Sequence, residues 1–203
     1  MLHLSTIDTT TLELLKSLML IEEFSNLRLV GGTALALQIG HRRSIDLDLL
    51  GEVNFETLDK TAAFRNFDKV TALSASKNIN IYSIDDVKVD FVNYSYPWLQ
   101  DQLVEDGVRL ADIEDIAAMK LAAITGRGSR KDFIDIYFLL QNHSLREMLA
   151  FYKKKYFDAS EYLVLKSLTY FDDAEDDIDV AVAKEISWDK IKAYILSSVE
   201  GRV

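Results

Sequence analysis

The segment from Val30 to Leu50, VGGTALALQIGHRRSIDLDLL, restricts the folds open to this chain more than any other part of it. A short apolar run ends at Gly31-Gly32, and residues 33–39 then carry the apolar spacing of a short helix. Residues 44–50 alternate apolar and acidic side chains, which is typical of a strand. A strand, a glycine turn, a helix and a second strand in this order predict a sheet with helices packed against it.

Two acidic residues in the second of these strands form a candidate metal site. Asp46 and Asp48 are two residues apart, so we expect their side chains to share one face of the sheet, with Leu47 and Leu49 on the other. Neighbouring carboxylates repel each other unless a cation lies between them. Carboxylate oxygens suit Mg²⁺, or Mn²⁺ as its alternative, and Mg²⁺ also binds the phosphates of a substrate.

The glycine turn is a candidate phosphate site. Gly31 and Gly32 let the backbone approach a ligand closely, and the free N–H groups at the start of the following helix attract anions. Thr33 adds a hydroxyl that we expect to contact the same phosphate. Glycine pairs before helices are also common as plain turns, so the prediction depends on the acidic strand that follows.

A third carboxylate lies further along the chain, in the strand-like sequence VKVDFV. Val89 and Phe91 are predicted to share one face of this strand, with Lys88 and Asp90 on the other. An acid among β-branched residues suggests a specific role. We expect Asp90 to be a further metal ligand or the base that activates an acceptor hydroxyl.

The rest of the chain changes character near its middle. Residues 10–24 and 55–67 have helical spacing, and residues 80–84 and 87–94 read as two strands joined by a turn. After residue 101 the pattern is helical, with helices predicted at residues 112–125, 131–141, 145–156, 159–171 and 188–199. An acidic connector, residues 172–179, separates the last two and is expected to be solvated. We predict an α+β fold with domains at residues 1–100 and 101–203.

Composition limits the class of protein. With 203 residues the chain can bury a core, and without cysteine it has neither disulfides nor thiolate metal sites. A net charge of −10 argues against a general affinity for nucleic acid and suits a protein that binds cations. The three histidines are not clustered, which argues against zinc. The chain lacks a leader and a long apolar run, so we expect a cytoplasmic protein with no membrane contact.

Several motifs resemble those of a known group of enzymes. The pattern G-G-[ST] followed by D-x-D resembles the first motif of the DNA polymerase β-like nucleotidyltransferase superfamily. The fuller string GGTALALQIGHRRSIDLDLL resembles the AbiEii/AbiGii toxin nucleotidyltransferases. Asp115 and Lys120, in DIAAMK, resemble the D-x4-K motif of that family, and RGSRKDFIDIYFLL resembles its last motif, in which an Arg and an Asp follow.

This resemblance implies a mixed β-sheet core with flanking helices, followed by a helical C-terminal region that completes the active site. It implies transfer of an NMP from an NTP, with Mg²⁺, to an acceptor hydroxyl of tRNA or protein, by a toxin opposed by a cognate antitoxin. Asp46 and Asp48 would bind the metal and Lys120 the triphosphate. Asp132 or Asp135 would complete the site. The base stays open between Asp90, Asp132 and Asp135.

Other interpretations remain open at this point. Ser129 and Asp132 also fit a helix-capping box, and Lys120 is equally consistent with a solvent lysine. Arg127 and Arg130, in the loop before the last motif, are predicted to contact substrate phosphates, with a solvated loop as the alternative. His41 suits either a ligand contact or a structural hydrogen bond. At the level of function, the alternatives are a nucleotidyltransferase-fold binding module without turnover and a kinase-like phosphotransferase.

Overall fold

The computed structural model describes residues 1–177, 182 and 186–201, and in it the chain forms two compact units. The first, here called the sheet unit, comprises residues 1–40, 44–95 and 102–111. The second, the helical unit, comprises residues 41–43, 96–101 and 112–203. This division differs from the single boundary predicted at residue 100, because residues 102–111 belong to the sheet unit and residues 41–43 to the helical unit.

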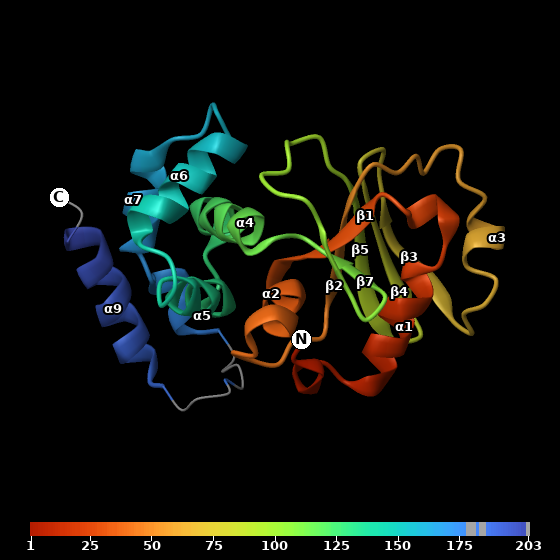
Figure 1. Ribbon diagram of the computed structural model, residues 1–203, viewed down its shortest axis with the longest axis horizontal. Coiled ribbons are helices and arrows are strands. Elements are labelled where there is room, and N and C mark those ends of the chain that lie inside the picture. The colour runs from red at the N-terminus through yellow and green to blue at the C-terminus, as the bar shows by residue number, and fades with distance from the viewer. Residues whose placement is uncertain (178–181, 183–185, 202–203) are drawn as a thin grey trace. The chain divides into compact units, whose positions relative to one another are not determined.

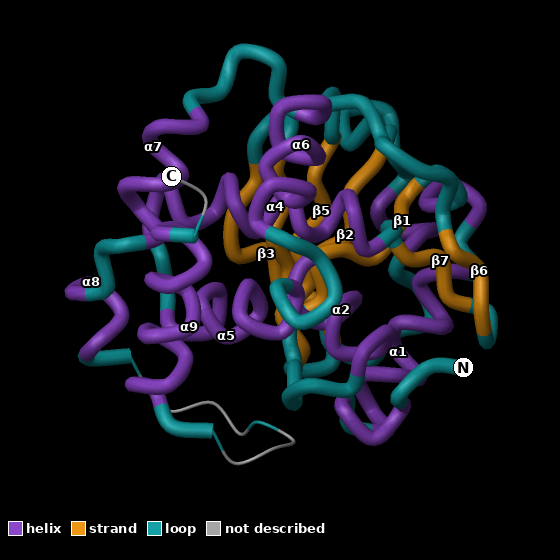
Figure 2. Tube along the Cα trace, turned by 60° about the vertical axis from the view of Figure 1, so that its left-hand side comes forward, coloured by secondary structure: helices purple, strands orange, loops and turns teal. Residues whose placement is uncertain are grey.

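The sheet unit is built on a mixed sheet whose strands follow the order β3-β4-β5-β2-β1-β7-β6 in the described part of the chain. The pairs β2–β5 and β1–β7 are parallel and the remaining pairs are antiparallel. Figures 1 and 2 show these strands as one twisted sheet. The predicted α+β class with a mixed sheet is confirmed. The strands are β1 (Leu27–Val30), β2 (Leu47–Gly51), β3 (Val70–Ala75), β4 (Ile79–Ile84), β5 (Val87–Asn93), β6 (Leu103–Glu105) and β7 (Val108–Leu110).

The helices of the sheet unit begin and end at recognisable signals. Helix α1 (Thr9–Met19) begins after Asp8, whose carboxylate accepts a hydrogen bond from the backbone N–H of Thr11. Helix α2 (Gly31–Ile39) ends at Gly40, which has a left-handed φ of +67°. The unit also contains the short helix α3 (Lys60–Ala63) and two 3-10 turns, η1 (Leu4–Thr6) and η2 (Glu22–Phe24).

The helix predicted over residues 55–67 is wrong in extent, because only α3 is an α-helix there. Phe55 and Phe64 of this segment join Phe24 in a cluster around Phe91, whose ring centre lies 4.9 Å from Phe24, 5.6 Å from Phe55 and 6.1 Å from Phe64. The apolar spacing of this segment therefore reflects contacts with the sheet core, and not one continuous helical face.

The helical unit agrees with the sequence pattern to within a few residues at each helix end. Figure 1 shows its larger helices gathered in one bundle. Residues 172–177 of the predicted acidic connector contain one helical turn, while residues 178–179 lie outside the described residues. No helix in the described residues has the length and apolarity needed to cross a membrane. The helices are α4 (Ile113–Arg127), α5 (Arg130–Leu139), α6 (Leu145–Lys155), α7 (Glu161–Leu168), α8 (Asp172–Glu175) and α9 (Trp188–Glu200).

Candidate active site

The glycine turn and the acidic strand meet in the sheet unit. Strands β1 and β2 are antiparallel, with Val30 opposite Asp48, so α2 begins beside the acid. Gly31, the first residue of α2, has a left-handed φ of +68°, and a β-carbon built on it would lie 2.5 Å from Oδ2 of Asp48. Position 31 therefore needs a residue without a side chain, both for its φ and for the space that the Asp48 carboxylate fills.

Asp90 is the neighbour of Asp48 across the sheet. Strands β2 and β5 are parallel, and Asp48 is in register with Asp90. Residues in register point to the same face of a sheet, so the two carboxylates lie side by side. On the opposite face, Leu47, Leu49 and Phe91 are at most 1% exposed. The alternation predicted from the sequence therefore sorts apolar side chains into the core and acids away from it.

Asp46 lies just before β2, which begins at Leu47 and is shorter than the strand predicted from residue 44. Its backbone carbonyl accepts a hydrogen bond from the hydroxyl of Thr33, and the oxygen of that hydroxyl lies 2.8 Å from Ser44 Oγ, from which it can accept a hydrogen bond. Thr33 is 1% exposed. Its hydroxyl thus joins α2 to the segment that carries Asp46, which is a different partner from the phosphate that the sequence suggested.

Lys88 lies on the same strand face as Asp90. Its Nζ is 2.7 Å from Oδ1 of Asp90 and donates a hydrogen bond to Oδ2 at 2.8 Å. Burial lowers the pKa of Lys88, but the hydrogen bond and charge of Asp90, followed by the charges of Asp48 and Asp46, outweigh it, so the pKa is raised. Sequence reasoning placed Lys88 beside Asp90 without giving it a role.

The fit of a divalent ion depends on the pair Asp48 and Asp90. Among the described residues, no three Asp, Glu or His side chains are grouped to hold one ion. Mg²⁺ commonly takes one or two protein carboxylates and completes its shell with water and substrate phosphates, so a pair of carboxylates facing the same way is compatible with it. Because Gly31 has no side chain, the Asp48 carboxylate can lie directly beside the start of α2. These residues fit such an ion, whereas Asp46 remains a predicted ligand.

The helical unit contains a buried cluster of charges centred on Asp135. Lys120 Nζ lies 2.6 Å from Asp135 and 2.8 Å from Asp132, while Arg42 Nε donates to Asp135 at 2.6 Å. Asp135 is fully buried. Its burial raises the pKa of this carboxyl, but the charge of Lys120 and the hydrogen bonds from His41 and Arg42 hold the pKa well below its usual range. Asp135 is therefore ionised, and its role is to hold three other residues.

Lys120 was expected to bind a triphosphate, and the structure surrounds it with protein. Burial lowers the pKa of Lys120, but the charges of Asp135 and Asp132 outweigh this effect and raise it. Asp132 also caps α5, because its carboxylate accepts hydrogen bonds from the hydroxyl of Ser129 at 2.5 Å and from its N–H at 3.3 Å. The capping box predicted for these two residues is therefore present.

His41 is neutral in this cluster. Its Nε2 lies 2.7 Å from Oδ1 of Asp135, and its ring packs 5.2 Å from that of Phe138. Burial lowers the pKa of His41 more than Asp135 raises it, and the charges of Arg42 and Lys120 lower it further. The structural hydrogen bond offered as one interpretation of His41 is therefore present, and its Nδ1 has no hydrogen-bond partner among the described residues.

The remaining motif residues hold the helical unit together. Asp115, the acid of the D-x4-K pattern, pairs with buried Lys155 at 2.6 Å and accepts a hydrogen bond from the backbone N–H of Leu99 at 3.0 Å. Arg130 donates to the carbonyl of Ala174 and lies over the ring of Trp188. Arg127 is exposed at the end of α4. Binding of phosphate by Arg127 stays a prediction, while Arg130 has partners within its own unit.

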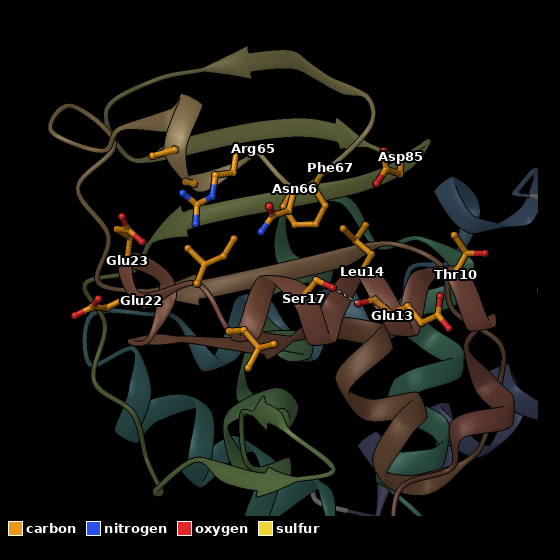
Figure 3. A pocket seen from close by; sticks show the side chains of 14 residues that line it. Thr10, Glu13, Leu14, Ser17, Glu22, Glu23, Arg65, Asn66, Phe67 and Asp85 are labelled. Atoms are coloured by element: carbon orange, nitrogen blue, oxygen red, sulfur yellow. Dashed lines mark hydrogen bonds between the residues drawn. The ribbon is translucent and has the colours of Figure 1, made fainter.

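A separate pocket of about 590 Å³ lies on the sheet unit, between α1 and the segment after α3 (Figure 3). Leu14 and Ser17 of α1 form one side, and Arg65 and Phe67 face them from the other. None of the residues predicted for the metal or phosphate sites lines it. The position of the glycine turn and the acids, rather than this pocket, therefore defines the candidate site.

Comparison with protein families and curated proteins agrees with this geometry. The family model described as nucleotidyl transferase AbiEii toxin, type IV TA system, matches residues 13–77 and 72–199. An uncharacterised protein of Aquifex aeolicus strain VF5 is 34% identical over 178 residues, which is 85% of each chain.

Solved structures share the fold. JHP933 from Helicobacter pylori has a TM-score of 0.62 at 16% identity, over 96% of this chain and 92% of the other. The nucleotidyltransferase toxin MenT4 from Mycobacterium tuberculosis H37Rv has a TM-score of 0.59 at 14% identity, over 92% and 82%. The predicted nucleotidyltransferase fold is thus confirmed.

Proposed function

The chain belongs to the AbiEii family of nucleotidyl transferase toxins, and from this premise we propose that it transfers an NMP from an NTP to an acceptor hydroxyl with the help of Mg²⁺ or Mn²⁺. The observation that carries the proposal is the contact between Gly31 and Asp48, with Asp90 in register beside it. The N-terminus of a helix can hold a phosphate, and one or two carboxylates beside it can hold the Mg²⁺ that accompanies a triphosphate.

In the proposed reaction, the acceptor oxygen attacks the α-phosphorus, the bond from that phosphorus to the bridging oxygen breaks, and pyrophosphate leaves. The hydroxyl proton passes to a carboxylate, for which we propose Asp90, because Asp135 is fully buried and paired with Lys120 and Arg42. A divalent ion held by Asp48, beside Asp90, would stabilise the charge on the phosphates. The protein contributes positioning and fixed charge, and no covalent intermediate is needed.

Each residue has a proposed part in this scheme. The N–H groups at Gly31 and Gly32 hold a phosphate, while Thr33 keeps the segment of Asp46 in place through its hydrogen bond to that residue's carbonyl. In the helical unit the buried ammonium of Lys120 is already paired with Asp132 and Asp135, so we propose that Lys120 stabilises this cluster and does not bind the triphosphate. We assign the exposed Arg127 to a contact with phosphates. Arg130 is a less suitable candidate because it already donates a hydrogen bond to the carbonyl of Ala174.

The proposed acceptor is an RNA such as tRNA, with a protein as the alternative, and the proposed role is that of a toxin restrained by a cognate antitoxin. The family to which the chain belongs supports this role. Expression of the chain should arrest growth in a host cell, and co-expression of a neighbouring gene should relieve the arrest. Arrest by an Asp48→Asn variant equal to that of the unaltered chain would contradict an enzymatic toxin.

Transfer itself is tested with labelled nucleotides. The purified chain is incubated with Mg²⁺, total RNA and each of the four NTPs, labelled at the α-phosphate in one series and at the γ-phosphate in another. We expect label to enter RNA or protein from the α position only, and to be lost in Asp48→Asn. Transfer from the γ position would indicate a phosphotransferase. NTP-dependent thermal stabilisation without transfer from any nucleotide would indicate a binding module.

A further inference from the structure

The ammonium of Lys88 is paired with Asp90, a carboxylate of the candidate metal site. Its Nζ is within 2.8 Å of both oxygens of Asp90, the carboxylate that stands in register with Asp48. Lys88 and Asp90 are two residues apart on β5, so they share the face that carries the candidate metal ligands. The protein therefore supplies one positive charge of its own at a site proposed to bind a divalent ion.

The location of this pair distinguishes it from an ordinary surface ion pair. Lys69 and Asp86, elsewhere in the sheet unit, also lie 2.6 Å apart, but their side chains are 65% and 77% exposed. The side chains of Lys88 and Asp90 are 45% and 20% exposed, and Lys88 also lies in the field of Asp48 and Asp46. The lower exposure of this pair weakens screening by water, so its charges act more strongly on their neighbours than those of Lys69 and Asp86.

We propose that Lys88 controls metal binding: its ammonium pairs with Asp90, competes with a divalent ion for that carboxylate, and leaves Asp48 as the principal ligand. This inference rests on the proposed function, in which Asp48 binds a metal. A cation already at Asp90 neutralises one carboxylate of the site, so the chain alone binds a divalent ion weakly. The phosphates of an NTP then provide the ligands that Asp90 does not.

The test measures Mn²⁺ alone, from the loss of the electron paramagnetic resonance signal of the free ion as protein is added. Lys88→Met should bind Mn²⁺ on the order of tenfold more tightly than the unaltered chain, because the competing charge is gone. Lys88→Arg should retain the original affinity. The double variant that combines Lys88→Met with Asp90→Asn should bind Mn²⁺ with an affinity close to that of the unaltered chain. It lacks the competing ammonium, but it also lacks the carboxylate that the loss of Lys88 would make available to the ion.

The controls test the role of Lys88 separately from the proposal that Asp48 binds a metal. Lys69→Met removes a lysine from an exposed lysine–aspartate pair in the same unit and should leave Mn²⁺ affinity unchanged. Circular dichroism of each variant verifies folding. Equal affinity of Lys88→Met and the unaltered chain overturns the role of Lys88, as does a double variant that binds as tightly as Lys88→Met. Mn²⁺ binding that survives Asp48→Asn instead overturns the metal assignment of the proposed function.

Discussion

Gly31 lies directly against the carboxylate of Asp48, so closely that a β-carbon at position 31 would stand 2.5 Å from Oδ2. This relationship joins two motifs that are seventeen positions apart in number but adjacent in the sheet, because Val30 pairs with Asp48 across β1 and β2. The helix start that is proposed to hold phosphate and the carboxylate that is proposed to hold metal therefore act as one structural element.

Gly31→Ala should abolish nucleotidyl transfer, because the added methyl group displaces the Asp48 carboxylate. It should also lower the free energy of unfolding by roughly 1–2 kcal/mol, since Gly31 has a left-handed φ of +68°. Gly107→Ala is the matched control: its φ is +79°, but a β-carbon there meets nothing within 4 Å. It should lose stability and keep transfer. Full transfer by a folded Gly31→Ala protein would contradict the proposed cradle.

Thr33→Val should destabilise the sheet unit by about 1–2 kcal/mol, because a buried hydroxyl that donates to the Asp46 carbonyl is lost. Thr33→Ser should retain most of the stability. Urea unfolding of both variants measures the difference. If Thr33→Val loses transfer with no change in stability, the hydroxyl serves a ligand and not the protein.

Asp135→Asn should lower the free energy of unfolding by about 3–5 kcal/mol, because Lys120 and Arg42 would keep their buried charges without the carboxylate that pairs with them. Asp86→Asn removes one partner of an exposed pair and should leave stability unchanged. Urea unfolding followed by circular dichroism compares the two. Equal stability of Asp135→Asn and the unaltered chain would show that the cluster does not hold the helical unit together.

His41 should make stability depend on pH. Its pKa is lowered by burial below the ordinary value of 6.5, so the unfolded chain binds the proton more readily than the folded one. Stability contributed by neutral His41 is therefore complete above that value and is lost as the pH falls through the folded pKa. Urea unfolding between about pH 7.5 and about pH 5.5 should show this decline, and His41→Gln should reduce it. An unchanged slope in that variant would assign the dependence to another group.

Much of the candidate site was predictable because it is local in sequence. The alternation around Asp48 and the glycines before α2 are short-range patterns with a direct physical meaning, and the structure brings Gly31 and Asp48 together as they suggest. The roles of Asp135 and Lys155 were not predictable in the same way. Each pairs with a residue far along the chain, Lys155 with Asp115 and Asp135 with Arg42, and no local pattern specifies such a pair.

Strands without a buried face also escaped prediction. All six residues of β3 are exposed, so no apolar alternation marks it. The hairpin of β6 and β7 did carry a signal, the turn residues Asp106-Gly107, both of which have positive φ. An Asp-Gly pair between apolar residues favours a two-residue hairpin turn, so this hairpin contradicts the prediction that the chain is helical throughout after residue 101.

The most direct test of the account is a crystal of the chain soaked with Mn²⁺ and a non-hydrolysable NTP. We predict an anomalous difference peak within coordination distance of the Asp48 carboxylate, with the triphosphate against the backbone of Gly31 and Gly32. A nucleotide bound instead in the pocket beside α1, or a metal peak that does not contact Asp48, would contradict the central claim.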